Sequence, residues 1–221
     1  MINKENLSLV IFDMDGVIIN SEPLHRMAFE QIKNELSKGT EVDVEDTAGA
    51  SAVEVYQNLL KACPPCALTP EEVASRHFEF VWQNIRDTAL ASGMDGLPSL
   101  LQLIDRKGCS YAVASSSPRS FVESCLTSVN MLTNAKAVIC GDSGFPVKPE
   151  PDMFLAALKA AGVPPQQAVI IEDSRLGTIA AQKAGIRCIG INNPDSGAQD
   201  LFAAGWIVEN LYQAAEIIKS L

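Results

Sequence analysis

Short apolar segments alternate with segments of helical periodicity over most of this chain, and this alternation strongly limits how it can fold. Apolar runs typical of buried strands occupy residues 8–12, 110–114, 137–140, 168–172, 187–191 and 206–208. Helical spacing of apolar residues occupies 98–107, 119–128, 151–161, 175–184, 198–204 and 210–219. Strands that alternate with helices over short connections predict an α/β fold with a Rossmann-like, doubly wound parallel sheet.

The segment after the first strand interrupts this alternation, because residues 21–90 carry helical patterns only. These patterns lie near 22–37, 52–62 and 70–90. Ser92-Gly93 and Asp95-Gly96 are turn-forming pairs where the chain returns to the sheet. We therefore predict a Rossmann-like core of residues 1–19 and 94–221, with an inserted all-helical cap domain of residues 20–93.

Composition favours a small-molecule partner. The 221 residues are 47% hydrophobic, and 17 Lys and Arg stand against 27 Asp and Glu, which gives a net charge of −10. An acidic chain has no general attraction for nucleic acid or anionic membranes. The first residues lack a signal-peptide pattern, and no apolar stretch reaches the roughly 18 residues of a membrane span. We expect a cytoplasmic protein, and a monomer.

The six cysteines fit a reducing compartment. Cys109, Cys125, Cys140 and Cys188 lie in or beside apolar segments and are predicted to be buried thiols. Cys63-Pro-Pro-Cys66 lacks both a second pair of zinc ligands and the strand-to-helix context of a redox pair, so we interpret it as a loop.

Polar residues follow the predicted strands where each one ends. Asp13-Met14-Asp15-Gly16 follows the first strand, residues 115–117 are three serines after the second, and Glu172-Asp173-Ser174 ends the fourth. Lys148-Pro149 lies in the loop after the third. Taken singly, each is also typical of a turn or a helix start. Because parallel strands end at one edge of a sheet, we expect these groups to converge into a metal and phosphate site.

The residue types suggest a division of work. Asp13 is predicted to attack phosphorus as a nucleophile, and Asp15 to act as general acid and base. Two close carboxylates raise each other's pKa unless a cation neutralises them. Mg²⁺ would take oxygens from Asp13, Asp173 and the main-chain carbonyl of Asp15, with Glu172 nearby.

The transferring phosphoryl group needs positive charge and hydrogen-bond donors. Lys148 and Ser115 are predicted to hold it, and Ser116 lies beside Ser115. Gly16 is predicted to add a backbone N–H from the turn after the first strand, where a glycine permits close approach.

The segments FDMDGVIINSEP, VASSS, VKPEPDMF and IIEDS resemble, in order, the four motifs of the haloacid dehalogenase-like hydrolase superfamily. The subgroup most similar has a helical cap after the first motif, and includes β-phosphoglucomutase, sugar-phosphate phosphatases and an inorganic pyrophosphatase. The resemblance implies a mobile cap, Mg²⁺ dependence and an aspartyl-phosphate intermediate on Asp13. It also implies an acid and base role for Asp15, phosphate contacts for Ser115 and Lys148, and metal contacts for Glu172 and Asp173.

Departures from the mutase pattern favour hydrolysis. His25 stands where relatives of β-phosphoglucomutase have a histidine, twelve residues after the nucleophile, and this match keeps a mutase possible. Those relatives also have Gly-x-Ser-Arg in the cap, whose arginine holds a second phosphate, but here the stretch is Gly49-Ala50-Ser51-Ala52. Pro118 likewise replaces a phosphate-contacting lysine. Cap residues predicted to contact the substrate are Glu22, His25, Gly49, Ser51 and Tyr56.

We therefore predict a Mg²⁺-dependent phosphatase of a small phosphorylated metabolite, with sugar phosphates as the leading class. The alternatives are a β-phosphoglucomutase-like mutase and an inorganic pyrophosphatase. A catalytically silent phosphometabolite-binding protein on the same fold is the non-enzyme alternative.

Overall fold

The computed structural model describes residues 6–44 and 49–221, and its centre is a six-stranded parallel sheet. The strands are β1 (Leu9–Phe12), β2 (Ser110–Ala114), β3 (Val138–Ile139), β4 (Ala168–Glu172), β5 (Arg187–Ile191) and β6 (Trp206–Val208). Their order is β3-β2-β1-β4-β5-β6, so β1 pairs in parallel with β2 on one side and β4 on the other. The predicted α/β class is confirmed. The strand order reverses between β1 and β4, so the topological switch point of the sheet lies beside β1.

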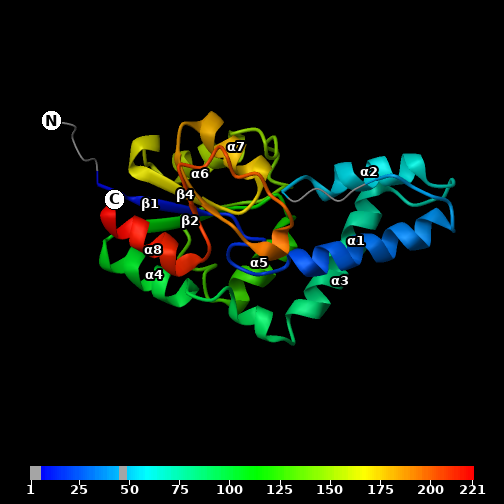
Figure 1. Ribbon diagram of the computed structural model, residues 1–221, viewed down its shortest axis with the longest axis horizontal. Helices are drawn as coiled ribbons and strands as arrows, with labels where there is room; N and C mark the ends of the chain where they lie inside the picture. The colour runs from blue at the N-terminus through cyan, green and yellow to red at the C-terminus, as the bar shows by residue number, and fades with distance from the viewer. Residues whose placement is uncertain (1–5, 45–48) are drawn as a thin grey trace.

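Helices cover both faces of the sheet (Figure 1). They are α4 (Leu97–Arg106), α5 (Arg119–Ser128), α6 (Asp152–Ala161), α7 (Arg175–Ala184) and α8 (Leu211–Ser220). Successive strand residues point to opposite faces. Val10 and Phe12 belong to the apolar cluster with α4, α5 and α8, whereas Leu9 and Ile11 belong to the cluster with α6 and α7. Both faces of β1 are thus buried, as expected of a central parallel strand.

Three further helices form a bundle beyond one end of the sheet (Figure 1). These are α1 (Glu22–Ser37), α2 (Ala52–Ala62) and α3 (Pro70–Ile85), and they share an apolar cluster that includes Phe29 and Leu59. Helix α3 begins with a capping box, in which Thr69 Oγ1 accepts from the Glu72 N–H at 3.2 Å and Glu72 Oε2 accepts from the Thr69 N–H at 2.8 Å. We propose residues 20–93 as a cap domain on this basis.

Two predicted helices differ from the structure. The helix predicted at 198–204 is wrong, because the short 3₁₀ helix η3 (Pro194–Ser196) is followed by turns. Leu201 is buried and would meet a Cβ added at Gly190 at 3.2 Å, so its apolar character reflects contact with the sheet. The helix predicted to reach residue 90 ends at Ile85 and is followed by the 3₁₀ helix η1 (Ala89–Ser92). The remaining element boundaries agree to within one residue.

The cysteines are free thiols, and Cys125, Cys140 and Cys188 are buried as predicted, while Cys109 is half-buried. Cys63 and Cys66 lie in the loop after α2 and form no disulfide. Among the described residues, no helix is both long enough and apolar enough to cross a membrane.

Candidate active site

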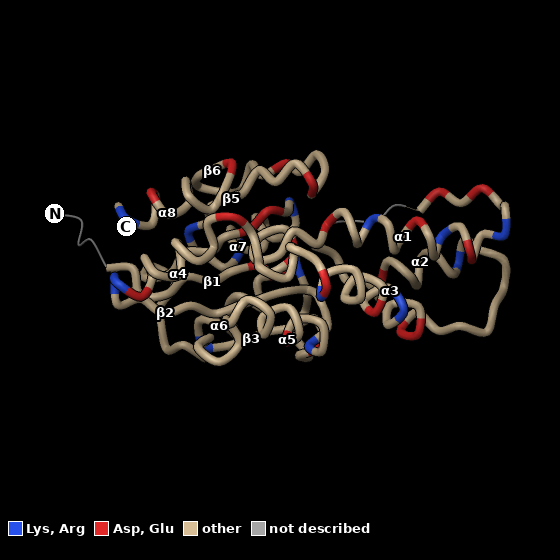
Figure 2. Tube along the Cα trace, turned by 90° about the horizontal axis from the view of Figure 1, so that it is seen from below, with Lys and Arg blue, Asp and Glu red and all other residues tan. Residues whose placement is uncertain are grey.

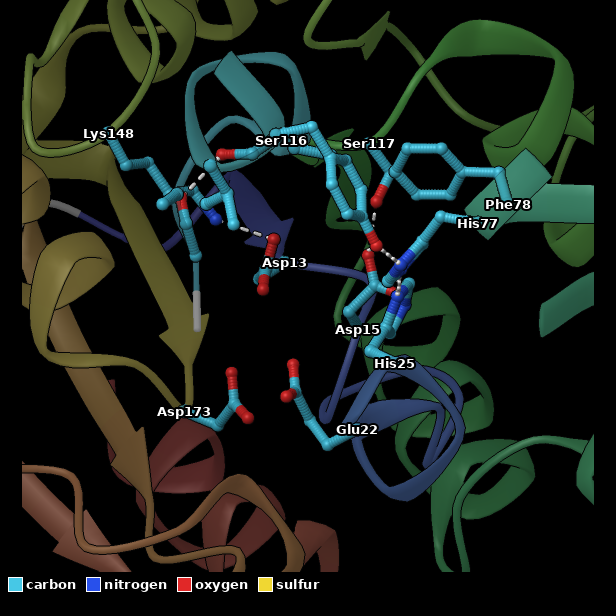
Figure 3. Close-up of a pocket in the computed structure, with 15 residues that line it drawn as sticks. Asp13, Asp15, Glu22, His25, His77, Phe78, Ser116, Ser117, Lys148 and Asp173 are labelled. Atoms are coloured by element: carbon cyan, nitrogen blue, oxygen red, sulfur yellow. Dashed lines mark hydrogen bonds and ion pairs between the residues drawn. The ribbon is translucent and has the colours of Figure 1, made fainter. Parts of the chain in front are cut away.

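A small cavity of about 60 Å³ lies between the carboxyl ends of the strands and the cap (Figure 3). We call it the inner cavity. Its core lining is Asp13, Asp15, Ser116, Ser117, Lys148 and Asp173, and its cap-side lining is Glu22, His25, Gly49, Ala50, Ala52, Val55, Tyr56, His77 and Phe78. The predicted convergence of the strand ends is therefore present. Asp13 and Asp173, which are 160 positions apart in the sequence, line the same cavity.

Lys148 lies between two buried carboxylates. Its Nζ donates to Asp13 Oδ1 at 2.5 Å and also to Glu172 Oε1. Burial lowers the pKa of Lys148, but the charges of Asp13 and Glu172 outweigh burial and raise it above the ordinary lysine value. The ammonium therefore stays charged beside Asp13. Asp13 Oδ2 accepts no hydrogen bond from the described residues.

Glu172 serves first to hold Lys148. Its second oxygen, Oε2, accepts from the Ser174 N–H at 2.7 Å and from Ser174 Oγ at 3.0 Å. Ser174 in turn caps α7 by accepting from the Gly177 N–H at 3.0 Å. A Cβ at Gly177 would lie 1.8 Å from Glu172 Oε1, so only glycine leaves room for this carboxylate.

Asp13, Glu172 and Asp173 form an acidic cluster in which ligand oxygens lie within 4.8 Å of one another. Burial, followed by the charge of Glu172, raises the pKa of Asp13 and of Asp173 well above the ordinary aspartate value. A divalent cation would offset this crowding, and carboxylate oxygens are the ligands that Mg²⁺ prefers. The donor set therefore fits Mg²⁺.

Asp15 faces the cap rather than the acidic cluster. Its Oδ1 accepts from Ser21 Oγ at 2.6 Å and from His25 Nε2 at 3.0 Å, and its Oδ2 accepts from Ser117 Oγ at 2.7 Å. Burial raises the pKa of Asp15, but the charge and hydrogen bond of His25, with the two serine hydrogen bonds, lower it to about 2. Asp15 is therefore a carboxylate in this arrangement.

The two histidines of the chain meet behind Asp15 (Figure 3). His25 Nδ1 lies 2.6 Å from His77 Nε2, and His77 Nδ1 lies 2.6 Å from the Tyr56 hydroxyl. Burial and the charge of His25 lower the pKa of His77 to about 3, so His77 is neutral. When His25 is neutral and donates to Asp15 through Nε2–H, Tyr56 donates to His77 and His77 donates to His25. When His25 carries a positive charge it donates to both Asp15 and His77, and His77 Nδ1–H donates to the Tyr56 hydroxyl oxygen.

Gly16 and Ser115, two further predicted site residues, lie beside the side chains described above. The Gly16 N–H donates to Ile19 C=O at 2.8 Å, and a Cβ at Gly16 would lie 1.9 Å from Asp173 Oδ2. Gly16, with φ +73°, thus closes the turn and admits Asp173. Ser115 Oγ is buried, accepts from the Ser117 N–H at 3.1 Å and lies 3.4 Å from Asp15 Oδ2.

Among the cap residues, Glu22, His25, Gly49 and Tyr56 line the inner cavity, whereas Ser51 lies outside it. Ser116 Oγ donates to Gly49 C=O at 2.9 Å and so joins the core to the cap. Sequence reasoning missed His77 and Phe78, and it placed Ser117 among the strand-end groups without giving it a role. His77 had one available signal, a histidine within an otherwise apolar helix face.

Comparison with known proteins gives one family. Residues 10–191 match the family model described as haloacid dehalogenase-like hydrolase. Protein SUPPRESSOR OF QUENCHING 1, chloroplastic, of Arabidopsis thaliana is 35% identical over 196 residues, a match that covers 87% of this chain and 18% of that protein. The chain thus spans under a fifth of that relative's length.

Two further matches cover nearly whole proteins. Validoxylamine A 7'-phosphate phosphatase of Streptomyces hygroscopicus subsp. limoneus is 29% identical, and the match covers 83% of this chain and 84% of that protein. The crystal structure of CbbY from Rhodobacter sphaeroides in complex with phosphate has a TM-score of 0.78 at 24% identity, covering 93% of this chain and 95% of that one. This second likeness is one of fold.

Proposed function

Since this chain belongs to the haloacid dehalogenase-like hydrolase family, we propose that it is a Mg²⁺-dependent phosphatase of a small phosphorylated metabolite, with a sugar phosphate as the leading class. The observation that carries the proposal is the meeting of Asp13, Asp15, Lys148 and Asp173 in one cavity. A relative that is named as a phosphatase, and that the match covers over 84% of its length, supports the same reaction class.

In the first step, Asp13 Oδ2 attacks phosphorus and the bond from phosphorus to the leaving oxygen breaks. Lys148, which hydrogen-bonds Asp13 Oδ1, favours the ionised form of the nucleophile and offsets charge on the phosphoryl oxygens. The leaving oxygen takes a proton from Asp15. In the second step, Asp15 takes a proton from water, the water oxygen attacks phosphorus, and the bond between phosphorus and Asp13 breaks.

Asp15 can both donate a proton to the leaving oxygen and accept one from water because His25 is hydrogen-bonded to it at 3.0 Å. A carboxyl group with a pKa of about 2 stays ionised, so its acid form needs a proton donor nearby. His25 Nε2 is the adjacent proton site, and His77 and Tyr56 fix the ring through Nδ1. We therefore propose His25 as the partner with which Asp15 shares its proton.

Mg²⁺ would be held by Asp13 and Asp173, with the Asp15 main-chain carbonyl and with Glu172 beside them. When bound, it would supply positive charge that lowers the pKa of the carboxylates and polarises the phosphoryl oxygens. Ser196 donates to Asp173 Oδ2 and orients that carboxylate.

The direct test is phosphate release from a panel of phosphorylated metabolites. We expect Mg²⁺-dependent release from several monoesters, loss of release with EDTA, and recovery when excess Mg²⁺ is restored. Conversion of β-glucose 1-phosphate to glucose 6-phosphate would instead favour a mutase, and release of two phosphates from pyrophosphate, with little from sugars, a pyrophosphatase. No metal-dependent turnover on any compound would favour the binding protein.

The histidine row gives a second prediction. His77→Phe keeps a ring but removes the hydrogen-bond partner of His25 Nδ1, so kcat should fall roughly tenfold while KM changes little, a part of the ~10²–10⁴-fold typical of general acid and base catalysis. His77→Gln, whose amide can both donate and accept, should recover part of the loss. Steady-state kinetics on the best monoester would show this. A raised KM with unchanged kcat would place His77 at the substrate instead.

A further inference from the structure

A second and larger hollow adjoins the inner cavity. It lies between α2 and α3 of the cap and α5 of the core, and it has a volume of about 740 Å³. We call it the outer groove. Ala52, Phe78 and Ser116 line both hollows, so the two meet at these residues. The inner cavity, at about 60 Å³, is far below the ~300–1,000 Å³ typical of sites that enclose a ligand. A leaving group larger than the phosphoryl group therefore needs space outside it.

Aromatic rings and hydroxyl groups make up much of the outer groove. Phe78, Trp82 and Phe121 provide the rings. The hydroxyls are those of Ser51, Ser75, Ser116, Ser120 and Ser124. Rings pack against the apolar face of a sugar or polyol. Ser75, Ser116 and Ser124 donate to backbone carbonyls, so their oxygens are left to accept from ligand hydroxyls, whereas Ser51 and Ser120 can both donate and accept. This combination suits a neutral, polyhydroxylated molecule.

The charges in the outer groove have one sign. Glu71, Glu79 and Asp142 line it, and no lysine or arginine does so among the described residues. Residues 45–48 contain no lysine or arginine either. Charged residues of both signs are spread along the chain, without one large basic stretch near α2, α3 and α5 (Figure 2). A second anion on the substrate would thus meet carboxylates and no compensating cation.

Lys148 and Arg119, cations that adjoin these hollows in space or in sequence, are already engaged. Lys148, in the inner cavity, contacts Asp13 and Glu172. Arg119, between two groove residues in sequence, directs its guanidinium to Glu123 at 3.2 Å and to the Val138 carbonyl and Ser143 hydroxyl at 3.3 Å each. Neither guanidinium nor ammonium is directed into the outer groove.

We propose that the outer groove receives the leaving group and selects a neutral, polyhydroxylated one over any leaving group with a second phosphate or a carboxylate. The proposal rests on the phosphatase function above and specifies its substrate class. Sugar or polyol monophosphates would then be hydrolysed in preference to sugar bisphosphates and to phosphorylated carboxylic acids.

Matched substrates isolate charge from size. 2-Hydroxyethyl phosphate and 2-phosphoglycolate have similar sizes, but only the second carries a carboxylate on its leaving group. Fructose 6-phosphate and fructose 1,6-bisphosphate form a larger pair. We expect kcat/KM to be roughly tenfold or more higher for the neutral member of each pair, the size of effect expected of one unsatisfied charged contact. Equal or higher kcat/KM for the anionic members would overturn the selectivity while leaving the phosphatase function intact. Failure to hydrolyse any of the four with Mg²⁺ would count against both.

Two variants test the groove itself. Ala52→Arg places a cation where the two hollows meet, and should shift the ratio of kcat/KM toward fructose 1,6-bisphosphate by roughly tenfold. Glu54→Arg, an exposed position on α2 that lines neither hollow, is the matched control and should leave the ratio unchanged.

Trp82→Ala should raise KM for fructose 6-phosphate several-fold, about the effect of losing one ring contact, but leave KM for 2-hydroxyethyl phosphate unchanged, because the smaller leaving group does not reach the ring. Thermal unfolding confirms that each variant is folded. An equal rise in KM for both esters, or an unchanged ratio in Ala52→Arg, would show that the leaving group lies elsewhere.

Discussion

Replacing Asp13 with asparagine is expected to abolish phosphate release while the protein stays folded. The amide has nearly the shape of the carboxylate but is not a nucleophile, so the aspartyl-phosphate cannot form. Loss of an essential nucleophile lowers kcat by about 10⁴-fold or more. Lys148 retains Glu172 as an ionic partner in this variant, so the buried ammonium is not left alone.

The measurement is phosphate release in saturating Mg²⁺, together with thermal unfolding. Asp105→Asn, at an exposed position on α4, is the matched control and should keep wild-type activity. Stopping the wild-type reaction in acid should trap phosphate on the protein, and the Asp13 variant should trap none. A wild-type rate in Asp13→Asn would exclude the proposed mechanism.

The sheet and the strand-end residues were predictable because both depend on local pattern. Buried parallel strands require continuous apolar runs, and their carboxyl ends must share one edge. Asp13, Lys148 and Asp173 could therefore be placed together from sequence, and the structure brings them into one cavity. Their catalytic and metal-binding roles stay predictions.

The contacts around Asp15 were not predictable in the same way. His25 and His77 lie 52 positions apart and meet through the packing of α1 against α3, which no local spacing encodes. Gly16 illustrates a second limit: the motif indicates a free backbone N–H, but the turn uses that group for Ile19. The helix predicted at 198–204 was wrong because the apolar side chain of Leu201 packs against the sheet and does not belong to a helix face. Periodicity alone does not distinguish these causes over so short a segment.

Replacing Lys148 with methionine is expected to lower both stability and activity. In the folded protein the side chains of Lys148 and Glu172 are 1% and 0% exposed, and Asp13 is 7% exposed. Removing one partner of a buried ion pair leaves charge uncompensated and costs about 3–5 kcal/mol of unfolding free energy. Loss of the ammonium near the phosphoryl group should also lower kcat by about 10²–10³-fold. Urea unfolding and phosphate release measure the two effects.

Lys183→Met is the matched control, because Lys183 pairs with Glu150 at 2.8 Å but the two side chains are 42% and 52% exposed. An exposed pair contributes only about 0–1 kcal/mol, so this variant should unfold like the wild type. Mg²⁺ offers a further discrimination. If it binds beside Asp13 and Asp173 as proposed, it replaces part of the missing positive charge, and should stabilise Lys148→Met more than the wild type. A loss no larger than in Lys183→Met would mean that the buried carboxylates are neutralised by protonation instead of by Lys148. Equal stabilisation of the two proteins by Mg²⁺ would contradict a Mg²⁺ site beside Asp13 and Asp173.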